Sequence, residues 1–181
     1  MKRKMFVRKA VLISLFSALI SVSAFLSVPV MAVPITMQSF AVFLALFILG
    51  PRAGTVSVFL YVFIGAVGMP VFSGFSGGIG RLFDIGGGFI FGFCILSLVY
   101  LALTSVIGMS IKAKIISAIF GQIALYATGV MWYVIGFNGD VITALVALVL
   151  PFLLFDAVKL LLAFLISFRL GKILEHLQRG R

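Results

Sequence analysis

The sequence predicts an all-α membrane protein with about six transmembrane helices. Of its 181 residues, 64% are hydrophobic and only 10% are charged, and the mean hydropathy is +1.35. A water-soluble domain is closer to half apolar and a quarter charged, so this chain has too little polar surface to cover a soluble globule. A spanning helix needs roughly 20 predominantly apolar residues. The length therefore allows about six spans with short loops, and we expect one membrane domain over residues 1–181.

The first apolar segment predicts a helix over Arg8–Val28 that stops near Pro29. A basic start followed by an apolar run also fits a cleaved signal peptide. However, the run Val11–Val33 is long enough to span a bilayer, so we expect a retained first helix.

Glycine, proline and polar residues separate five further apolar segments. The second helix is expected after the linker Val30–Thr36 and is short for a full span, which fits a tilted helix or one flanked by re-entrant backbone. The last helix is expected to begin near Val141 and can bend at Pro151. The five expected helices are Met37–Leu49, Thr55–Gly68, Phe89–Ile107, Lys114–Ile135 and Val141–Leu174. The breakers between the first three of them are Gly50–Gly54, Met69-Pro70 and the irregular, glycine-rich Val71–Gly88.

The distribution of basic residues predicts the orientation in the membrane. With the N-terminus inside, Arg81 falls in an outer loop and Lys159 lies well inside the last helix, while every other Lys and Arg falls toward the inner side. Cytoplasmic segments carry an excess of Lys and Arg. We therefore expect both termini in the cytoplasm and a multi-pass protein of the plasma membrane. The net charge of +10 reflects this topology and does not indicate nucleic-acid binding.

The most informative feature is an acid and a base inside the last apolar segment. Asp156 and Lys159 are three residues apart, so both lie on one face of a helix. An ionisable group at the centre of a membrane helix costs roughly 2.5–3.5 kcal/mol on insertion scales, and it is tolerated when it pairs or faces a polar cavity. The pair therefore predicts a solute site, or else an internal ion pair that only tightens the bundle.

Arg81 follows a glycine-rich run that includes Gly74, Gly77 and Gly78. Glycines let backbone approach a ligand closely and turn back on itself. A guanidinium at the mouth of a cavity can hold a ligand carboxylate through two hydrogen bonds. The alternative is a surface arginine that pairs with Asp84.

Several other residues can face a cavity or serve the fold alone. Thr36 and Gln38, at the start of the second helix, can cap that helix or bind a solute. Trp132 lies near the outer end of the fifth helix, where aromatic residues also belt membrane interfaces. An apolar ligand body would need aromatic walls, for which the candidates are Phe40, Phe72, Phe75, Tyr126 and Trp132.

The sequence contains no recognisable motif for binding a metal ion or a nucleotide. It has one cysteine, Cys94, which we expect to pack as a small apolar residue, so we predict neither a metal nor a cofactor. The phosphate-binding pattern Gly-x-x-x-x-Gly-Lys-Ser/Thr does not occur. If transport is driven by ATP, another subunit has to hydrolyse it.

Small residues recur every four positions in the first helix, at Ala10, Ser14 and Ala18. Such a stripe makes a flat helix face that another helix can approach closely. The partner can lie inside the bundle or in another protein, and the spacing can also arise by chance in a segment so rich in Ala and Ser.

Four stretches of the sequence, in order, carry a family resemblance. They are Val33–Phe40 with Leu49–Gly54, then Gly65–Gly74, then Gly121–Tyr126 with Gly129 and Trp132, and last Pro151–Lys159. Together they resemble BioY, the biotin-capturing S component of energy-coupling factor transporters, over most of the chain. Where the family often has Gly-Asn, this chain has Gly121-Gln122.

The resemblance implies a six-helix S component that holds biotin near its outer face. It implies docking through Ala10, Ser14 and Ala18 on a membrane-spanning coupling subunit, T, that is driven by two cytoplasmic ATPase subunits. The alternatives are an S component for another small vitamin and a membrane protein outside transport. An enzyme would need a nucleophile or an acid–base pair in a cavity. Asp156 and Lys159 could form such a pair, but no histidine or cysteine supports them.

Overall fold

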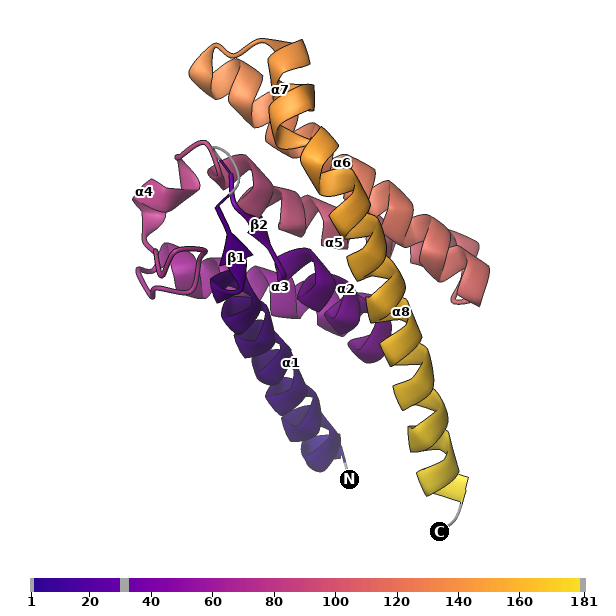
Figure 1. Cartoon of the computed structure of the whole chain (residues 1–181). Coiled ribbons are helices and arrows are strands. Elements are labelled where there is room, and N and C mark those ends of the chain that lie inside the picture. Colours follow the sequence, from indigo (N-terminus) through magenta and orange to yellow (C-terminus); the bar gives the residue numbers. More distant parts are fainter. Residues whose placement is uncertain (1, 30–32, 180–181) are drawn as a thin grey trace.

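The protein, described here by a computed structural model over residues 2–29 and 33–179, folds almost entirely into helices (Figure 1). A small antiparallel ribbon joins the first two helices, with Ser27 paired to Thr36. The elements in order are α1 Lys2–Phe25, β1 Ser27–Val28, β2 Ile35–Thr36, α2 Gln38–Leu49, α3 Pro51–Ala66, α4 Ile79–Leu82, α5 Gly87–Ile107, α6 Ile111–Phe137, α7 Val141–Leu148 and α8 Leu150–Arg179.

Within the described residues, four helices are long and apolar enough to cross a membrane: Phe6–Phe25, Gly87–Ile107, Ile111–Phe137 and Leu150–Leu170. Large apolar side chains on these helices face outward, for example Ile123 on α6 and Leu154 on α8. A surface of exposed apolar side chains is suited to contact with lipid and not with water. The prediction of a helical membrane protein is therefore confirmed, with two further apolar helices, α2 and α3, that are shorter than a span.

The short helix α2 forms the centre of the bundle. It packs against α1, α3 and α8, while α5 packs along α6. Most of its side chains are buried, including Phe43 and Leu46. A helix that is hydrophobic on all sides is expected inside a protein. Since a 12-residue helix is only about 18 Å long, α2 does not bridge the roughly 30 Å of a hydrocarbon core.

The turn between α2 and α3 is tighter than the predicted Gly50–Gly54. Gly50 alone separates the helices, with φ of +83°, which is a conformation that favours glycine. Pro51 then occupies the first position of α3, where its missing N–H has no helical partner to lose. Gly54 lies so close to α2 that a Cβ would come within 2.8 Å of Leu46 Cα.

The predicted last helix is divided into two. α7 ends at Leu148, and Pro151 lies in the first turn of α8, where proline is tolerated. Asp140 caps α7 by accepting a hydrogen bond from the Thr143 backbone N–H at 2.9 Å, and this bond lowers the pKa of Asp140. The expected bend at Pro151 is thus a break at Val149.

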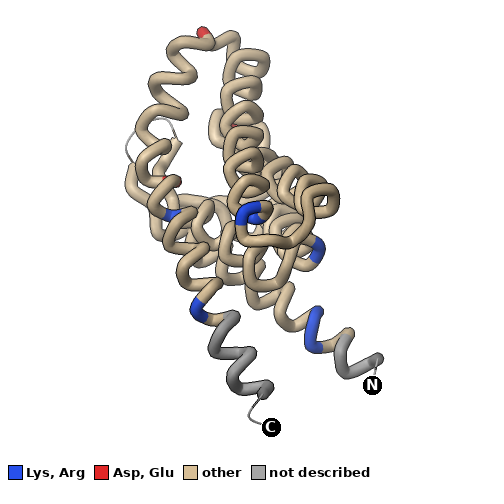
Figure 2. Tube along the Cα trace, turned by 90° about the vertical axis from the view of Figure 1, so that its right-hand side faces the viewer, with Lys and Arg blue, Asp and Glu red and all other residues tan. Residues whose placement is uncertain are grey.

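The two ends of the described chain lie at the same end of the bundle (Figure 1). The glycine-rich stretch that carries α4 lies away from them, next to the β1–β2 ribbon. Figure 2 shows most Lys and Arg positions between the middle of the molecule and the end that holds both termini. The architecture therefore separates a basic end from the end that carries α7.

Candidate ligand-binding site

A buried ion pair on α8 is the centre of the site. Lys159 Nζ lies 2.9 Å from Asp156 Oδ1, and the two side chains are 8% and 7% exposed. The pair forms within one helix because residues at i and i+3 share a face. The helix that carries the pair, α8, begins at Leu150, directly after the break at Val149. Asp156 therefore lies in the second turn of this helix.

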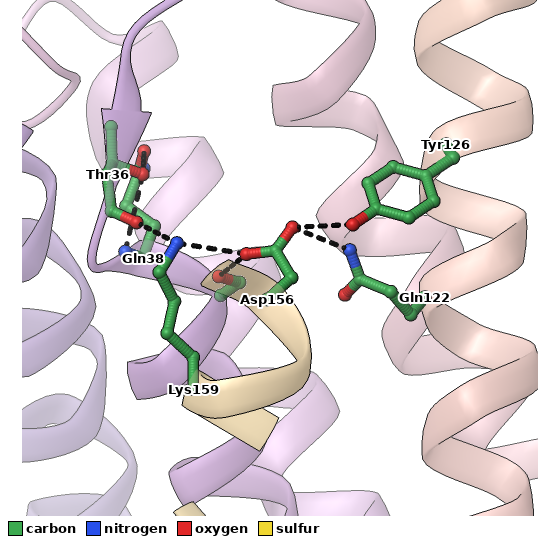
Figure 3. A network of polar contacts seen from close by, with 7 residues as sticks. Thr36, Gln38, Gln122, Tyr126, Asp156 and Lys159 are labelled. Carbon is green, nitrogen blue, oxygen red and sulfur yellow. Dashed lines mark hydrogen bonds and ion pairs between the residues drawn. The ribbon is translucent and has the colours of Figure 1, made fainter. Parts of the chain in front are cut away.

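The Asp156 carboxylate connects three helices (Figure 3). Its Oδ1 accepts hydrogen bonds from Ser39 Oγ of α2 at 2.8 Å and from Lys159 Nζ at 2.9 Å. Its Oδ2 accepts from Gln122 Nε2 at 3.0 Å and from Tyr126 Oη at 2.8 Å, both on α6. The carboxylate thus has four donors, and it links α6 to α8 inside the bundle.

Lys159 extends the same network toward the β1–β2 ribbon. Its Nζ donates to the backbone oxygen of Thr36 at 2.7 Å. Thr36 Oγ1 donates to Gln38 Oε1 at 2.9 Å, and Gln38 Nε2 donates to Tyr61 Oη on α3. Polar groups from β2, α2, α3, α6 and α8 are therefore tied together around one buried charge pair. Figure 3 shows these groups apart from the one on α3.

This network forms part of the wall of a cavity of about 60 Å³, several times the space that one water needs. The wall combines a polar side with apolar and aromatic surface. The polar lining residues are Thr36, Gln38, Ser39, Ser73, Arg81, Tyr126, Asp156 and Lys159, and the apolar ones include Val33, Phe72, Phe89, Ile90, Phe93, Leu125 and Phe152. Such a site suits a ligand with a compact polar group and an apolar body.

Arg81 lines the cavity and also pairs with its neighbour. Its Nη1 lies 2.6 Å from Asp84 Oδ2, and the side chains of Arg81 and Asp84 are 30% and 57% exposed. The two interpretations of Arg81 from the sequence are thus not exclusive. The guanidinium has five N–H donors, so it can bind a ligand carboxylate as well as Asp84.

The glycines predicted beside Arg81 shape its loop and do not line the cavity. Gly74 and Gly78 have φ of +73° and +91°, and Gly78 directly precedes α4. A Cβ at Gly77 would collide with the backbone oxygen of Met69. A ligand-binding role for these glycines stays a prediction.

Three of the predicted aromatic residues lie outside the cavity wall. Phe75 is 70% exposed and stacks on Phe25, with ring centroids 4.3 Å apart. Phe40 is half-buried against the core. Trp132 packs between the rings of Phe83 and Phe91, and its Nε1 donates to the backbone oxygen of Asp84 at 3.1 Å. Their contact with a ligand stays a prediction, whereas Phe72 and Tyr126 line the cavity.

Three residues in the network were not predicted as site residues: Ser39, Tyr61 and Gln122. Ser39 directly follows Gln38, and the sequence offered no separate signal for it. Gln122 stands where the resembling family often has asparagine, so that position did carry a signal. The rings of Phe89 and Phe152, which stack with centroids 6.1 Å apart, were also not anticipated.

The small-residue stripe of α1 faces outward. Ala10, Ser14 and Ala18 are exposed, whereas Phe16 and Ile20 on the other side of the helix are buried. The stripe is therefore accessible to another chain or to lipid.

The fold and the site together define a helical membrane protein with an internal cavity built around a buried ion pair. The fold is shared with the crystal structure of an S component for biotin from an ECF-type ABC transporter. That likeness has a TM-score of 0.85 and covers 95% of both chains at 24% identity.

Sequence comparison identifies the family. The model of the BioY family matches residues 1–176. The biotin transporter BioY of Thermotoga maritima is 39% identical over 92% of this chain and 97% of its own length. The probable biotin transporter BioY of Pyrococcus horikoshii is also 39% identical, over 88% of this chain and 93% of its own length. The chain belongs to the BioY family, which confirms the resemblance seen in the sequence.

Proposed function

We propose that this protein is the biotin-capturing S component of an energy-coupling factor transporter in the plasma membrane. The observation that carries the proposal is the buried Asp156–Lys159 pair at a cavity that also has apolar walls. Membership of the BioY family and its relatives' names as biotin transporters support it. Because these relatives are transporters, we favour transport over an enzymatic function.

The chemistry of biotin fits the residues of the cavity. The ureido ring offers two N–H donors and one carbonyl acceptor. Asp156 can accept an N–H, and Lys159 can donate to the carbonyl or hold the valerate carboxylate. Arg81 is the alternative anchor for that carboxylate. The thiophane ring and valerate chain would lie against the apolar wall around Phe89 and Phe152.

We further propose six membrane-associated helices in one domain over residues 1–181, with both termini in the cytoplasm. The distribution of Lys and Arg supports this orientation. It places the glycine-rich loop with Arg81 toward the outer side, from which biotin would enter.

The function is tested by equilibrium binding of labelled biotin to the detergent-purified protein, with dethiobiotin and riboflavin as competitors. We expect saturable binding at one site per chain that dethiobiotin blocks and riboflavin does not. Competition by riboflavin or another vitamin in place of biotin would identify an S component of different specificity. A folded protein that binds no biotin would contradict the proposal.

The partners of an S component of this type are a membrane-spanning T subunit and two ATPase subunits, and we propose that Ala10, Ser14 and Ala18 form the docking face. The face is exposed and flat, which allows close helix approach. Ser14→Leu should abolish co-purification with a co-expressed T subunit while biotin binding is retained. The matched control is Val11→Phe, which adds bulk at an exposed position of α1 outside the stripe. Equal loss in both variants would contradict a specific docking stripe.

A further inference from the structure

The hydrogen-bond capacity of the Asp156 carboxylate is filled without a ligand. An ionised carboxylate has about four lone-pair sites and cannot donate. Ser39, Lys159, Gln122 and Tyr126 supply four donors, at 2.8 to 3.0 Å. A ligand N–H can therefore be accepted by Asp156 only if one of these four donors leaves.

The four donors are not equally displaceable. Lys159 carries the charge that neutralises Asp156, and removing a partner from a buried ion pair leaves an uncompensated charge. Gln122 does not line the cavity, so an entering ligand does not meet its amide first. Ser39 and Tyr126 are neutral hydroxyl donors, and both line the cavity. The choice lies between these two.

An unused acceptor lies on the Gln122 amide, whose nitrogen contacts the same carboxylate oxygen as the Tyr126 hydroxyl. Gln122 Oε1 is buried and has no hydrogen-bond partner among the described residues. The orientation of this amide follows from chemistry, because the carboxylate accepts only and so must face the NH₂ group. Gln122 Nε2 and Tyr126 Oη both contact Asp156 Oδ2, which places the amide nitrogen next to the hydroxyl, and the amide oxygen lies on the far side of that nitrogen (Figure 3). A buried acceptor without a partner is unfavourable, so a hydroxyl that turned to Oε1 would remove that cost.

We propose that Tyr126 is the exchangeable donor of the site. A ring N–H of a cyclic urea replaces the Tyr126 hydroxyl on Asp156 Oδ2, and the tyrosine side chain shifts along the amide so that its hydroxyl donates to Gln122 Oε1. The number of hydrogen bonds inside the protein is conserved, and Asp156 stays paired with Lys159. A ligand that has no N–H facing Asp156 Oδ2 does not displace the Tyr126 hydroxyl from that oxygen, so it makes no hydrogen bond with Asp156. Tyr126 is in this sense a specificity-determining residue, and the inference rests on the proposed biotin-binding function.

The proposal predicts that removing a polar group from the cavity wall strengthens binding. In Tyr126→Phe, Asp156 Oδ2 has a free lone pair, so biotin displaces nothing. We expect a Kd for biotin about three- to tenfold lower than that of the unaltered protein, because in the unaltered protein a charge-assisted hydrogen bond to Asp156 has to be exchanged for a weaker one to a neutral amide. Isothermal titration in detergent measures this change.

Ser39→Ala is the matched control, since it removes the other hydroxyl that donates to Asp156 from the same cavity wall. We expect its Kd for biotin to be higher, because Asp156 loses a hydrogen-bond donor while the Tyr126 hydroxyl still has to be displaced. A Kd for Tyr126→Phe that is equal to or above that of the unaltered protein would overturn the proposal. So would a tightening in Ser39→Ala as large as in Tyr126→Phe, because Ser39 would then be the displaced donor.

A spectroscopic measurement on the unaltered protein covers the case in which Tyr126→Phe does not fold. Transfer of a tyrosine hydroxyl from a carboxylate to an amide acceptor changes the tyrosine absorption, so saturation with biotin should produce a tyrosine difference spectrum. Absence of that spectrum at full saturation contradicts the exchange. If the unaltered protein binds no biotin, the proposed function itself fails. If it binds biotin and Tyr126→Phe is not tighter, only the exchange fails.

Discussion

The protein contains two ion pairs with the same spacing and opposite surroundings. Arg81 pairs with Asp84 at 2.6 Å, and Lys159 pairs with Asp156 at 2.9 Å, each at i and i+3. The first pair lies on the irregular segment at α4 with 30% and 57% of its side chains exposed. The second lies in the membrane-spanning α8 with 8% and 7% exposed. The sequence spacing within the two pairs is thus the same, and the surroundings of each pair determine what that pair does.

The difference in environment determines which cation is free to change partner. An exposed pair contributes about 0–1 kcal/mol, so Arg81 can leave Asp84 at little cost. Breaking a buried pair by removing one partner costs about 3–5 kcal/mol, because a charge is left without compensation. Asp156 also joins α2, α6 and α8 through its hydrogen bonds. The buried pair therefore organises the cavity, and the exposed pair can supply an adjustable contact at its wall.

The largest effect is expected for Asp156→Asn. The change leaves Lys159 charged and buried and turns one acceptor into a donor that faces other donors. We expect biotin affinity to fall at least about 100-fold, which corresponds to roughly 3 kcal/mol, and the melting temperature to fall as well. Isothermal titration and thermal unfolding in detergent measure the two quantities. Near-normal affinity and stability would show that the two pairs are equivalent despite their surroundings.

A smaller effect is expected for Arg81→Gln. Loss of a partly exposed guanidinium should weaken biotin binding by about tenfold, because a charge-assisted hydrogen bond to a carboxylate is lost. The affinity for biotin methyl ester, which has no carboxylate, should be the same in the variant and in the unaltered protein. Equal loss for biotin and its ester would assign Arg81 to the shape of the loop, and the carboxylate would then be left to Lys159.

The smallest effect is expected for Asp84→Asn, which applies the substitution of Asp156→Asn to the exposed pair. Because an exposed pair contributes little, the affinity for biotin should change less than about threefold, and the melting temperature should be nearly unchanged. A loss as large as that of Arg81→Gln would mean that Asp84 holds Arg81 in its binding position. The difference between the two pairs would then depend on how Asp84 positions Arg81 as well as on how deeply each pair is buried.

The sequence by itself determined the class of protein and the charges at the centre of the site. Hydropathy depends on composition, so the apolar segments that became α1, α5, α6 and α8 could be recognised without a structure. The i and i+3 spacing of Asp156 and Lys159 is local, and a charge pair in an apolar helix is unfavourable enough to stand out. Prediction was weaker at the start of α3, which is Pro51 and not Thr55, and at the break at Val149, because neighbouring packing decides those boundaries.

Only the tertiary structure decided which other side chains meet this charge pair. Ser39 and Gln122 reach Asp156 from positions 117 and 34 residues away, and no local pattern specifies such contacts. Likewise, Phe152 lines the cavity while Trp132 packs on Phe83 and Phe91, although an aromatic residue in an apolar segment has the same sequence signal in either place. Helix packing sets these positions, because the rotation and crossing of each helix determine which of its faces turns inward.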